Sequence, residues 1–179
     1  MSVLPIVEIP DPRLRLVCEP VEAVDDGVRA LVADMFDTMY AAHGIGLAAS
    51  QVGVIRRVMV VDLQERETEE EDAKPEAKRD PRVFINPEIL SVSDEMSTYS
   101  EGCLSIPEQY AEVERPARCR VKWLDENGAA HEDEFSGLMA TCVQHEIDHL
   151  NGVLFIDHIS RLKRQMLVKK LDKARKAAA

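Results

Sequence analysis

The sequence has few cysteines, no long apolar run and no excess of positive charge over most of its length. No apolar stretch approaches the roughly 20 residues of a transmembrane helix, so we expect no membrane span. The N-terminal stretch MSVLPIVEIPDPRLRL lacks both a basic leader and a continuous apolar core, and we expect no secretory signal there. These absences indicate a cytoplasmic protein, whose four cysteines are thiols or metal ligands rather than disulfides.

Charge is divided unevenly along the chain. The net charge is −11, but residues 161–179 contain eight basic side chains and one acidic one, which leaves −18 on the first 160 residues. Such an acidic body cannot neutralise a run of phosphates, which excludes general nucleic-acid binding by the body. The basic segment starts with Ser160, a good N-cap, and predicts a C-terminal helix over about 160–176. Its apolar residues are expected along one side of that helix: Leu162, Met166, Leu167 and Leu171.

Length and composition predict a single domain spanning residues 1–179. A chain of 179 residues is long enough for one proper core and too short for two. Residues 65–80, ERETEEEDAKPEAKRD, lack any large apolar side chain, so they cannot bury enough surface to offset the entropy of ordering. We expect a solvated insertion loop there. An acidic cation-binding loop is the less favoured alternative, because the segment has no turn-forming glycine.

Apolar periodicity predicts both helices and strands. After Asp25, apolar residues recur at helical spacing and predict a helix that ends near Gly44. A second helix, rich in apolar side chains and therefore buried, is expected from about Gly137 to Gly152. Strands are expected where β-branched residues cluster, at 54–63, 82–87 and 118–125, with a hairpin turn at Asn127-Gly128 and a returning strand at 129–135.

The stretch QHEIDHLNG lies within the second helix. Two of the chain's five histidines, His145 and His149, are four residues apart, and residues at this spacing lie on the same face of a helix. Two converging imidazoles make half of a metal site, and Glu146 beside them is placed to move a proton of a water on that metal. A buried pair of histidines also needs polar partners, which a metal would supply. The motif therefore indicates metal-dependent hydrolysis.

A third metal ligand is available upstream, in EGCLSIP. Cys103 follows a glycine and precedes an isoleucine-proline pair, which places it on a strand or at its edge. Alone it would be a small buried hydrophobe, but a thiolate with two imidazoles is a sensible ligand set that leaves a fourth position open for water. The stretch GIGLAASQ has glycines that let a backbone approach a ligand, and it ends in the side-chain amide of Gln51. It lacks the lysine of a phosphate-binding loop.

GIGLAASQ, EGCLS and QHEIDHLNG, in this order and at these separations, resemble the three signature motifs of the peptide deformylases. The resemblance covers nearly the whole chain apart from the loop at 65–80. It implies an α+β fold, with mixed and antiparallel sheets around a central helix that carries the metal-binding histidines, and a C-terminal helix. It also implies a metal-dependent hydrolase that removes the formyl group from formyl-methionine at the N-terminus of newly made proteins and releases formate.

The resemblance assigns roles by position. Cys103, His145 and His149 would hold the metal; Glu146 would be the general base and acid acting on the metal-bound water; Gln51, through its side chain, and Leu104, through its backbone N–H, would complete an oxyanion site; Gly46 and Gly102 would lie against the substrate backbone. Helical spacing from His145 adds Cys142 and Leu138, with Ile45, as candidates for the slot that receives the substrate's methionine. Ordinary core packing is the alternative for these three.

Cofactor and partners follow from the same resemblance. The family is associated with Fe(II), but two imidazoles and a thiolate also suit Zn(II), Co(II) or Ni(II), so the ligands do not identify the metal. Long C-terminal helices in related bacterial enzymes are implicated in docking near the ribosome's exit tunnel, and a +7 segment fits contact with RNA. We expect a monomer that acts on formyl-methionine nascent peptides.

The chain departs from the family pattern at Tyr110, where many members carry a basic residue after CLSIPEQ. Either substrate docking beyond the methionine differs in this chain, or Tyr110 is a surface residue without a role. Neither case alters the expected chemistry.

Two other functions compete with the deformylase interpretation. The helical motif alone would favour a metallopeptidase, whose usual third ligand is a downstream His or Glu, and the upstream Cys103 argues against it. A structural metal site or an inactive binding relative would need a saturated four-ligand site. The open position and Glu146 argue against that alternative.

Overall fold

The computed structural model describes residues 2–65 and 78–179. Within these residues the chain forms three α-helices, seven strands and three short 3-10 helices. The α-helices are α1 (Asp26–Ala41), α2 (Gly137–Leu150) and α3 (Arg161–Ala178). The strands are β1 (Gly46–Ala48), β2 (Val58–Val61), β3 (Arg82–Val92), β4 (Met96–Cys103), β5 (Ile106–Pro116), β6 (Arg118–Leu124) and β7 (Ala130–Ser136). The 3-10 helices are η1 (Pro12–Arg15), η2 (Ala49–Val52) and η3 (Phe155–His158).

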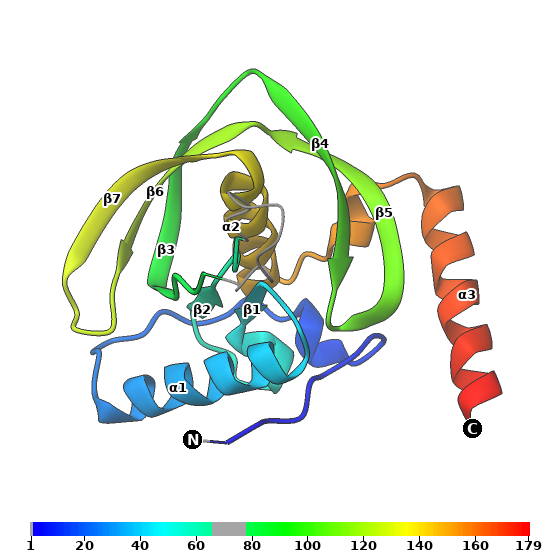
Figure 1. The fold of residues 1–179 in the computed structure, drawn as a ribbon, viewed down its shortest axis with the longest axis horizontal. Helices are drawn as coiled ribbons and strands as arrows, with labels where there is room; N and C mark the ends of the chain where they lie inside the picture. The colour runs from blue at the N-terminus through cyan, green and yellow to red at the C-terminus, as the bar shows by residue number, and fades with distance from the viewer. Residues whose placement is uncertain (1, 66–77) are drawn as a thin grey trace, which may run out of the picture.

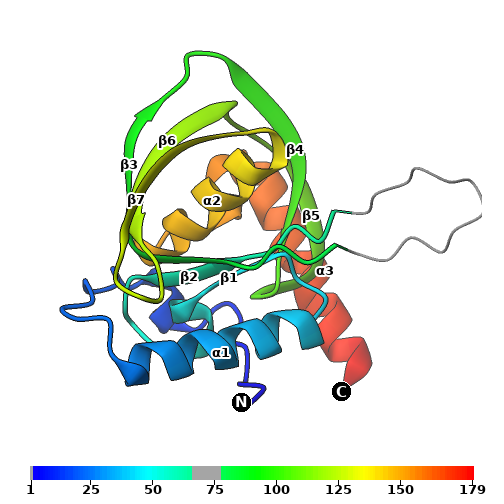
Figure 2. The ribbon, with the colours of Figure 1, turned by 60° about the vertical axis from the view of Figure 1, so that its left-hand side comes forward.

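Two antiparallel sheets surround helix α2. Five strands pair in the order β1-β2-β3-β6-β7, and β4 and β5 form a separate hairpin. The parallel component among the described residues is an isolated bridge between Glu19 and Arg56. Figures 1 and 2 show α2 inside the arch that these strands make, with α1 beneath β1 and β2 and α3 beside β5. The predicted α+β fold with a central helix and a C-terminal helix is confirmed.

Helix α2 is the most deeply buried helix of the fold. Ten of its fourteen side chains are buried, including both histidines, and Val143 and Leu150 join a core cluster with Phe84 of β3 and Val121 of β6. Strand β7 runs directly into the helix through Gly137, which takes a positive φ of 59° that favours glycine. The predicted helix is therefore confirmed, and it ends two residues before the expected Gly152.

Helix α1 begins where the sequence predicts. The Asp25 carboxylate accepts a hydrogen bond from the Val28 N–H and caps the helix. Its buried residues pack under β1 and β2 in a second cluster: Val28, Val32, Met35 and Met39. This layer supports the GIGLAASQ stretch, which forms β1 and η2.

The hairpin of β4 and β5 was not predicted as strands. Outward positions on β5 carry glutamates, and two of the inward positions carry charged residues, Glu101 on β4 and Arg115 on β5. Because apolar alternation is missing from this segment, the pattern that signals a half-buried strand is absent from the sequence. The inward charges of the hairpin pair with one another and with α2, and Ile106 and Val113 add buried apolar packing.

The C-terminal helix is confirmed, but its predicted apolar side is only partly correct. The Ser160 side chain caps α3 by accepting from the Lys163 N–H, and Leu167 and Leu171 are buried in a cluster with β5 and η3. Leu162 and Met166 are exposed instead, at 68% and 53%. They lie on a different face of the helix from Leu167 and Leu171, because each pair is four residues apart and the two pairs are offset by five.

The predicted loop at 65–80 lies largely outside the described residues, which omit 66–77. Among the residues that are described, no helix is long and apolar enough to cross a membrane.

Candidate metal centre

Three predicted ligands meet at one point between β4 and α2. His145 and His149 lie one helical turn apart, with 3.3 Å between their Nε2 atoms, and the Cys103 Sγ at the end of β4 lies 3.3 Å from the His149 Nε2. All three donor atoms are within 4.8 Å of one another. Within residues 2–65 and 78–179, this is the one group of three His, Cys, Asp or Glu side chains able to hold a metal ion.

A buried ion pair fixes the orientation of His145. The Glu101 carboxylate accepts a hydrogen bond from the His145 Nδ1 at 2.8 Å, and Arg115 donates two hydrogen bonds to the same carboxylate at 2.7 and 3.0 Å. Arg115 also donates to Asp148 on α2 at 2.8 Å. Because the Nδ1–H donates to the carboxylate, Nε2 is the ring nitrogen of His145 that faces His149 and the ligand cluster.

The electrostatics of the cluster favour a bound cation. Burial lowers the pKa of His145, but hydrogen bonds with Cys103 and Glu101 outweigh it and raise that pKa to about 10. Burial, together with the nearby His145, lowers the pKa of His149 well below its ordinary value and keeps that imidazole neutral. A raised pKa means that His145 is protonated at Nε2 as well as at Nδ1, and a divalent cation would replace the Nε2 proton beside the Cys103 sulfur. The donor set therefore fits a metal ion.

Glu146 lies beside the cluster with one oxygen free. Its Oε1 is 4.0 Å from the His145 Nε2, and its buried Oε2 has no hydrogen-bond partner among the described residues. Burial raises the pKa of this carboxyl to about 7, despite the opposing effect of His145. A carboxyl with such a pKa can both accept and return a proton in neutral solution.

Gly46 makes room for that carboxylate. A β-carbon at this position would lie 2.6 Å from the Glu146 Oε1 and 3.0 Å from the Cys142 Sγ, so no side chain fits there. The predicted close approach at Gly46 is thus observed toward Glu146. Its approach to a substrate backbone stays a prediction.

The Gln51 amide is held with its nitrogen toward the cluster. The Ala48 N–H donates to the Gln51 Oε1 at 2.9 Å, while the Gln51 Nε2 donates to the Ser105 Oγ at 3.1 Å and to the Cys103 Sγ at 3.4 Å. Leu104 follows Cys103, and a β-carbon on Gly44 would lie 2.8 Å from its side chain. The Leu104 side chain therefore packs against the backbone at Gly44, and the role of its N–H stays a prediction.

An open pocket of about 480 Å³ adjoins the cluster. Every predicted site residue except His149 lines it: Cys103, His145, Glu146, Gln51, Leu104, Gly46, Ile45, Gly102, Cys142 and Leu138. Cys142 is buried, whereas Ile45 and Leu138 are more than one-third exposed at the rim. Burial and the nearby Glu146 raise the pKa of the Cys142 thiol well above its ordinary value, so it presents a neutral S–H.

Sequence reasoning missed the groups that support the ligands. Glu101, Arg115 and Ser105 are buried polar residues that hold His145 and Gln51 in place. Glu101 carried one available signal, since it stands two residues before Cys103 in EGCLS and so on the same strand face. Arg115 is fourteen residues from Glu101 and reaches it only through the hairpin, which the sequence pattern did not reveal.

The fold and the site define a class of protein. Three ligands of the Cys-His-His kind, with a carboxylate beside them and an open pocket, are the arrangement of hydrolases that use a metal-activated water. A family model described as Polypeptide deformylase matches residues 3–165. The chain therefore belongs to the polypeptide deformylase family and is an enzyme of that family.

Relatives support this assignment over the full length. A peptide deformylase of Rhizorhabdus wittichii is 65% identical over 177 residues, covering 99% of this chain and 98% of the relative. The crystal structure of a peptide deformylase from Legionella pneumophila matches with a TM-score of 0.87 and 44% identity, covering 99% of this chain and 98% of that one. A peptide deformylase from Ehrlichia chaffeensis, solved in complex with actinonin, matches with a TM-score of 0.86 and 44% identity, covering 97% and 98% of the two chains.

Proposed function

We propose that this chain removes the formyl group from formyl-methionine at the N-terminus of newly made proteins and releases formate. The observation that carries the proposal is the Cys103, His145 and His149 cluster beside the unpartnered Glu146 oxygen, both at an open pocket. Family membership supports the choice of a formyl group as the target. We propose further that residues 1–179 act as a single catalytic domain and as a monomer, in the cytosol where nascent chains are made.

Cys103, His145 and His149 are the proposed ligands of one divalent ion, with Fe(II) expected. Their sulfur and imidazole donors also suit Zn(II), Co(II) and Ni(II). When bound, such an ion lowers the pKa of a water molecule and polarises a carbonyl oxygen. The ion pair of Glu101 and Arg115 keeps His145 oriented for its role as a ligand.

Glu146 acts first as a general base and then as a general acid. It takes a proton from the water that attacks the formyl carbon, because its free Oε2 has no hydrogen bond to give up. It then delivers that proton to the methionine nitrogen as the formyl C–N bond breaks. The products are formate and a free amino terminus, and Glu146 returns to its starting charge.

Gln51 and the Leu104 N–H stabilise the negative charge that grows on the formyl oxygen during attack. The Gln51 Nε2 is already directed at the Cys103 side of the pocket because its amide oxygen is held by Ala48. A fixed donor loses little entropy when the charge appears, and removing one such donor typically costs about 2.7–4 kcal/mol of barrier.

The methionine side chain enters the slot formed by Cys142, Ile45 and Leu138. The neutral Cys142 thiol and two aliphatic side chains suit a thioether. Gly46 and Gly102 lie against the substrate backbone, which runs along the edge of β4 that is not paired with β5. With the methionine in the slot, the formyl group points at the ligand cluster.

The proposal is tested by measuring formate release from formyl-Met-Ala-Ser, using protein prepared anaerobically with Fe(II). Two matched peptides serve as controls. In acetyl-Met-Ala-Ser an acetyl group replaces the formyl group, and Met-Ala-Ser has a free amino terminus. We expect formate from the first peptide and no product from the other two. Cleavage of Met-Ala-Ser into amino acids would indicate a metallopeptidase instead, and no formate from fully metal-loaded protein would overturn the proposal.

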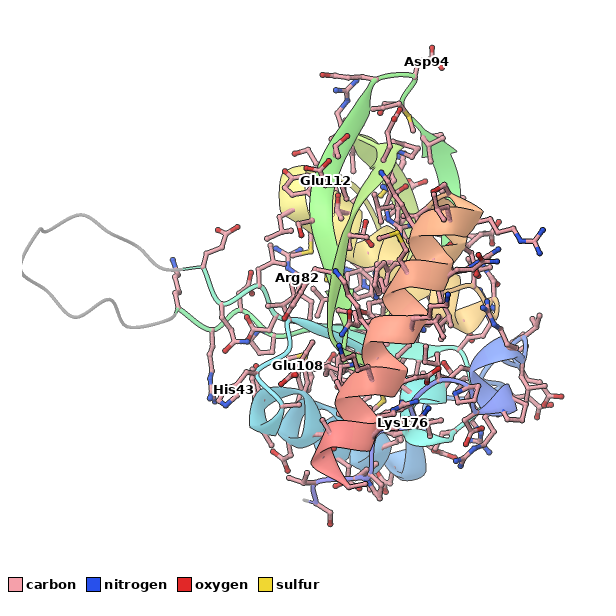
Figure 3. The ribbon with its side chains drawn as sticks, turned by 90° about the vertical axis from the view of Figure 1, so that its right-hand side faces the viewer. His43, Arg82, Asp94, Glu108, Glu112 and Lys176 are labelled. Atoms are coloured by element: carbon pink, nitrogen blue, oxygen red, sulfur yellow. The ribbon has the colours of Figure 1, made fainter. Side chains whose placement is uncertain are left out.

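Helix α3 is proposed as the contact with the ribosome. Its exposed lysines include Lys163, Lys170, Lys173 and Lys176, the last of which is labelled at the end of the helix in Figure 3. A strip of cations on an acidic protein favours a polyanion such as ribosomal RNA, with affinity that falls as salt rises.

Charge removal tests this contact better than truncation, because Leu167 and Leu171 belong to the core. Replacing Lys163, Lys170 and Lys173 with glutamine is expected to reduce co-sedimentation with ribosomes at low salt. The control replaces Arg118, Arg120 and Lys122 of β6, which removes the same charge elsewhere. Equal binding by the two triple variants would contradict a role for α3.

A further inference from the structure

The outer face of β5 borders the mouth of the catalytic pocket. Glu108, Tyr110 and Glu112 of this strand are all exposed; Tyr110 and Glu112 alternate regularly, and Glu108 lies in the irregular stretch before them. Glu108 and Tyr110 also line the pocket. Figure 3 looks onto this side of the molecule and labels Glu108 and Glu112, with His43 of the opposite pocket wall near Glu108.

Tyr110 is held against Gly102 of β4. The two residues are cross-strand partners, and a β-carbon on Gly102 would lie 2.5 Å from the Tyr110 Cε1. The ring therefore lies in the space that a side chain at position 102 would take, yet 70% of the tyrosine is exposed. An aromatic ring held in this way at a pocket mouth offers a face to a bound ligand.

Among the described residues that line the pocket, Glu108 is an exposed carboxylate and none is a lysine or an arginine. Arg79 lies over the Tyr40 ring at 4.2 Å, and Arg82 pairs with Asp80 at 3.3 Å. Glu108 lies near the tip of the hairpin and has a positive φ of 59°, which is unusual for a residue other than glycine.

Strand geometry decides which substrate residue meets this face. The ligand cysteine and Glu101 are on the inner side of β4, while Gly102 and Ser100 are on the outer side with Tyr110. A peptide extended along the free edge of β4 alternates in the same way. With the methionine side chain directed inward to the slot, the side chain of the second residue points outward, toward Tyr110 and Glu108.

We propose that Tyr110 and Glu108 make this enzyme select formylated peptides that carry lysine or arginine directly after the methionine. The ring face of Tyr110 attracts the cation, and Glu108 supplies an opposite charge. Peptides with an acidic second residue are disfavoured by the same two side chains. This inference rests on the proposed deformylation.

The test compares kcat/KM for formyl-Met-Lys-Ser and formyl-Met-Glu-Ser at low salt, with formate release as the readout. Formyl-Met-Ala-Ser is measured first, so that failure of deformylation itself is seen separately from failure of selectivity. A cation–π contact and an exposed ion pair each contribute modestly, so we expect the lysine peptide to be favoured roughly fivefold to tenfold. A ratio near one, or a preference for the glutamate peptide, would overturn the proposal.

The position of the charged residue in the peptide provides an independent test of the proposed selectivity. The pair formyl-Met-Ser-Lys and formyl-Met-Ser-Glu moves the charge to the third residue, whose side chain points inward. We expect a ratio below about twofold for this pair, because the charge is then directed away from Tyr110 and Glu108. An equal or larger preference at the third residue would contradict the assignment.

Variants separate the two side chains. Tyr110→Phe keeps the ring and is expected to keep most of the lysine preference, while Tyr110→Ala reduces it several-fold. Glu108→Gln is expected to lower the ratio and to remove its dependence on salt. The matched control is Glu114→Gln, an exposed outward glutamate of β5 that does not line the pocket. If Glu114→Gln lowered the ratio as much as Glu108→Gln, general electrostatics would replace the local contact as the explanation.

Discussion

The inner wall and the outer rim of the catalytic pocket are built in different ways. On the inner wall, His145, Glu146 and Gln51 are buried, and His145 and Gln51 each have a fixed hydrogen-bond partner. On the rim, Leu138 is more than one-third exposed and Tyr110 is 70% exposed. The difference indicates that the proposed chemical groups are held by buried hydrogen bonds, while the side chains at the rim are largely solvated.

A buried ion pair between Arg115 and Glu101 supports the inner wall of the pocket. Arg115 and Glu101 are each about 95% buried, yet the pKa of Glu101 is lowered because hydrogen bonds from His145 and Arg115 outweigh the effect of burial. A buried ion pair is costly to form and more costly to break. The site can therefore be damaged from a residue that touches neither the metal nor the substrate.

The largest effect is expected from breaking that ion pair. Arg115→Met removes two hydrogen bonds and the guanidinium charge from the buried Glu101, and breaking a buried pair in this way typically costs about 3–5 kcal/mol of stability. Loss of a group that orients a ligand also lowers metal affinity about 10–100-fold. Urea unfolding and metal titration measure the two effects.

The matched control for Arg115 is Arg118→Met, which breaks a surface pair with Glu95. We expect its stability and metal affinity to stay within experimental error of the wild type, because exposed pairs are screened by solvent. Equal losses in the two variants would mean that the buried network does not distinguish the inner wall.

A second effect follows from the raised pKa of Glu146. Burial raises this pKa from 4.5 to about 7, so the folded protein holds the proton more tightly than the unfolded chain does. The stabilising contribution is complete below about pH 4.5 and is lost as the pH rises through 7. Glu146→Gln avoids this loss. At pH 8 we expect the free energy of unfolding of the metal-free variant to exceed that of the metal-free wild type by roughly 3 kcal/mol.

Urea unfolding of both metal-free proteins at pH 5 and pH 8 measures this difference. Glu126→Gln, which changes an exposed carboxylate, provides the control. A gain from Glu146→Gln that is the same at both pH values would show that the carboxylate is not held in an unfavourable charged state.

The smallest effects are expected within the methionine slot, where the inner wall and the rim meet. Cys142→Leu fills space beside Glu146 and is expected to raise KM for formyl-Met-Ala-Ser about tenfold, since one methylene in a pocket is typically worth 10–200-fold. Leu138→Ala, at the rim, is expected to raise KM by roughly threefold because its side chain is partly solvated. Metal content is measured in both variants. A larger effect at Leu138 than at Cys142 would place the slot nearer to the rim.

Much of the fold and of the ligand set could be predicted from the sequence. Helices α1 and α2 were predicted because the apolar residues of a buried helix face recur in the sequence with a period of about 3.6 residues. The cluster of candidate ligands was predicted because His145 and His149 share a helix face and Cys103 stands in a recognisable motif. Short-range sequence patterns thus predicted the main residues of the inner wall.

The rest depended on contacts that no local pattern reports. The hairpin of β4 and β5 has charged residues on its inward side, so its strands lack the expected alternation. Arg115 reaches Glu101 only because the hairpin folds back, across fourteen residues of sequence. Leu162 and Met166 were expected on the same side of α3 as Leu167 and Leu171, but only the latter two face the core cluster with β5 and η3.

The central claim is that Glu146 moves the proton while Cys103, His145 and His149 hold the metal. The most direct measurement is kcat for formyl-Met-Ala-Ser together with metal content per chain, for Fe(II)-loaded wild type and Glu146→Gln. Loss of general acid–base catalysis typically lowers the rate by roughly 10²–10⁴-fold, and we expect that loss with one metal still bound per chain. A variant that keeps its metal and retains near wild-type kcat would contradict the account.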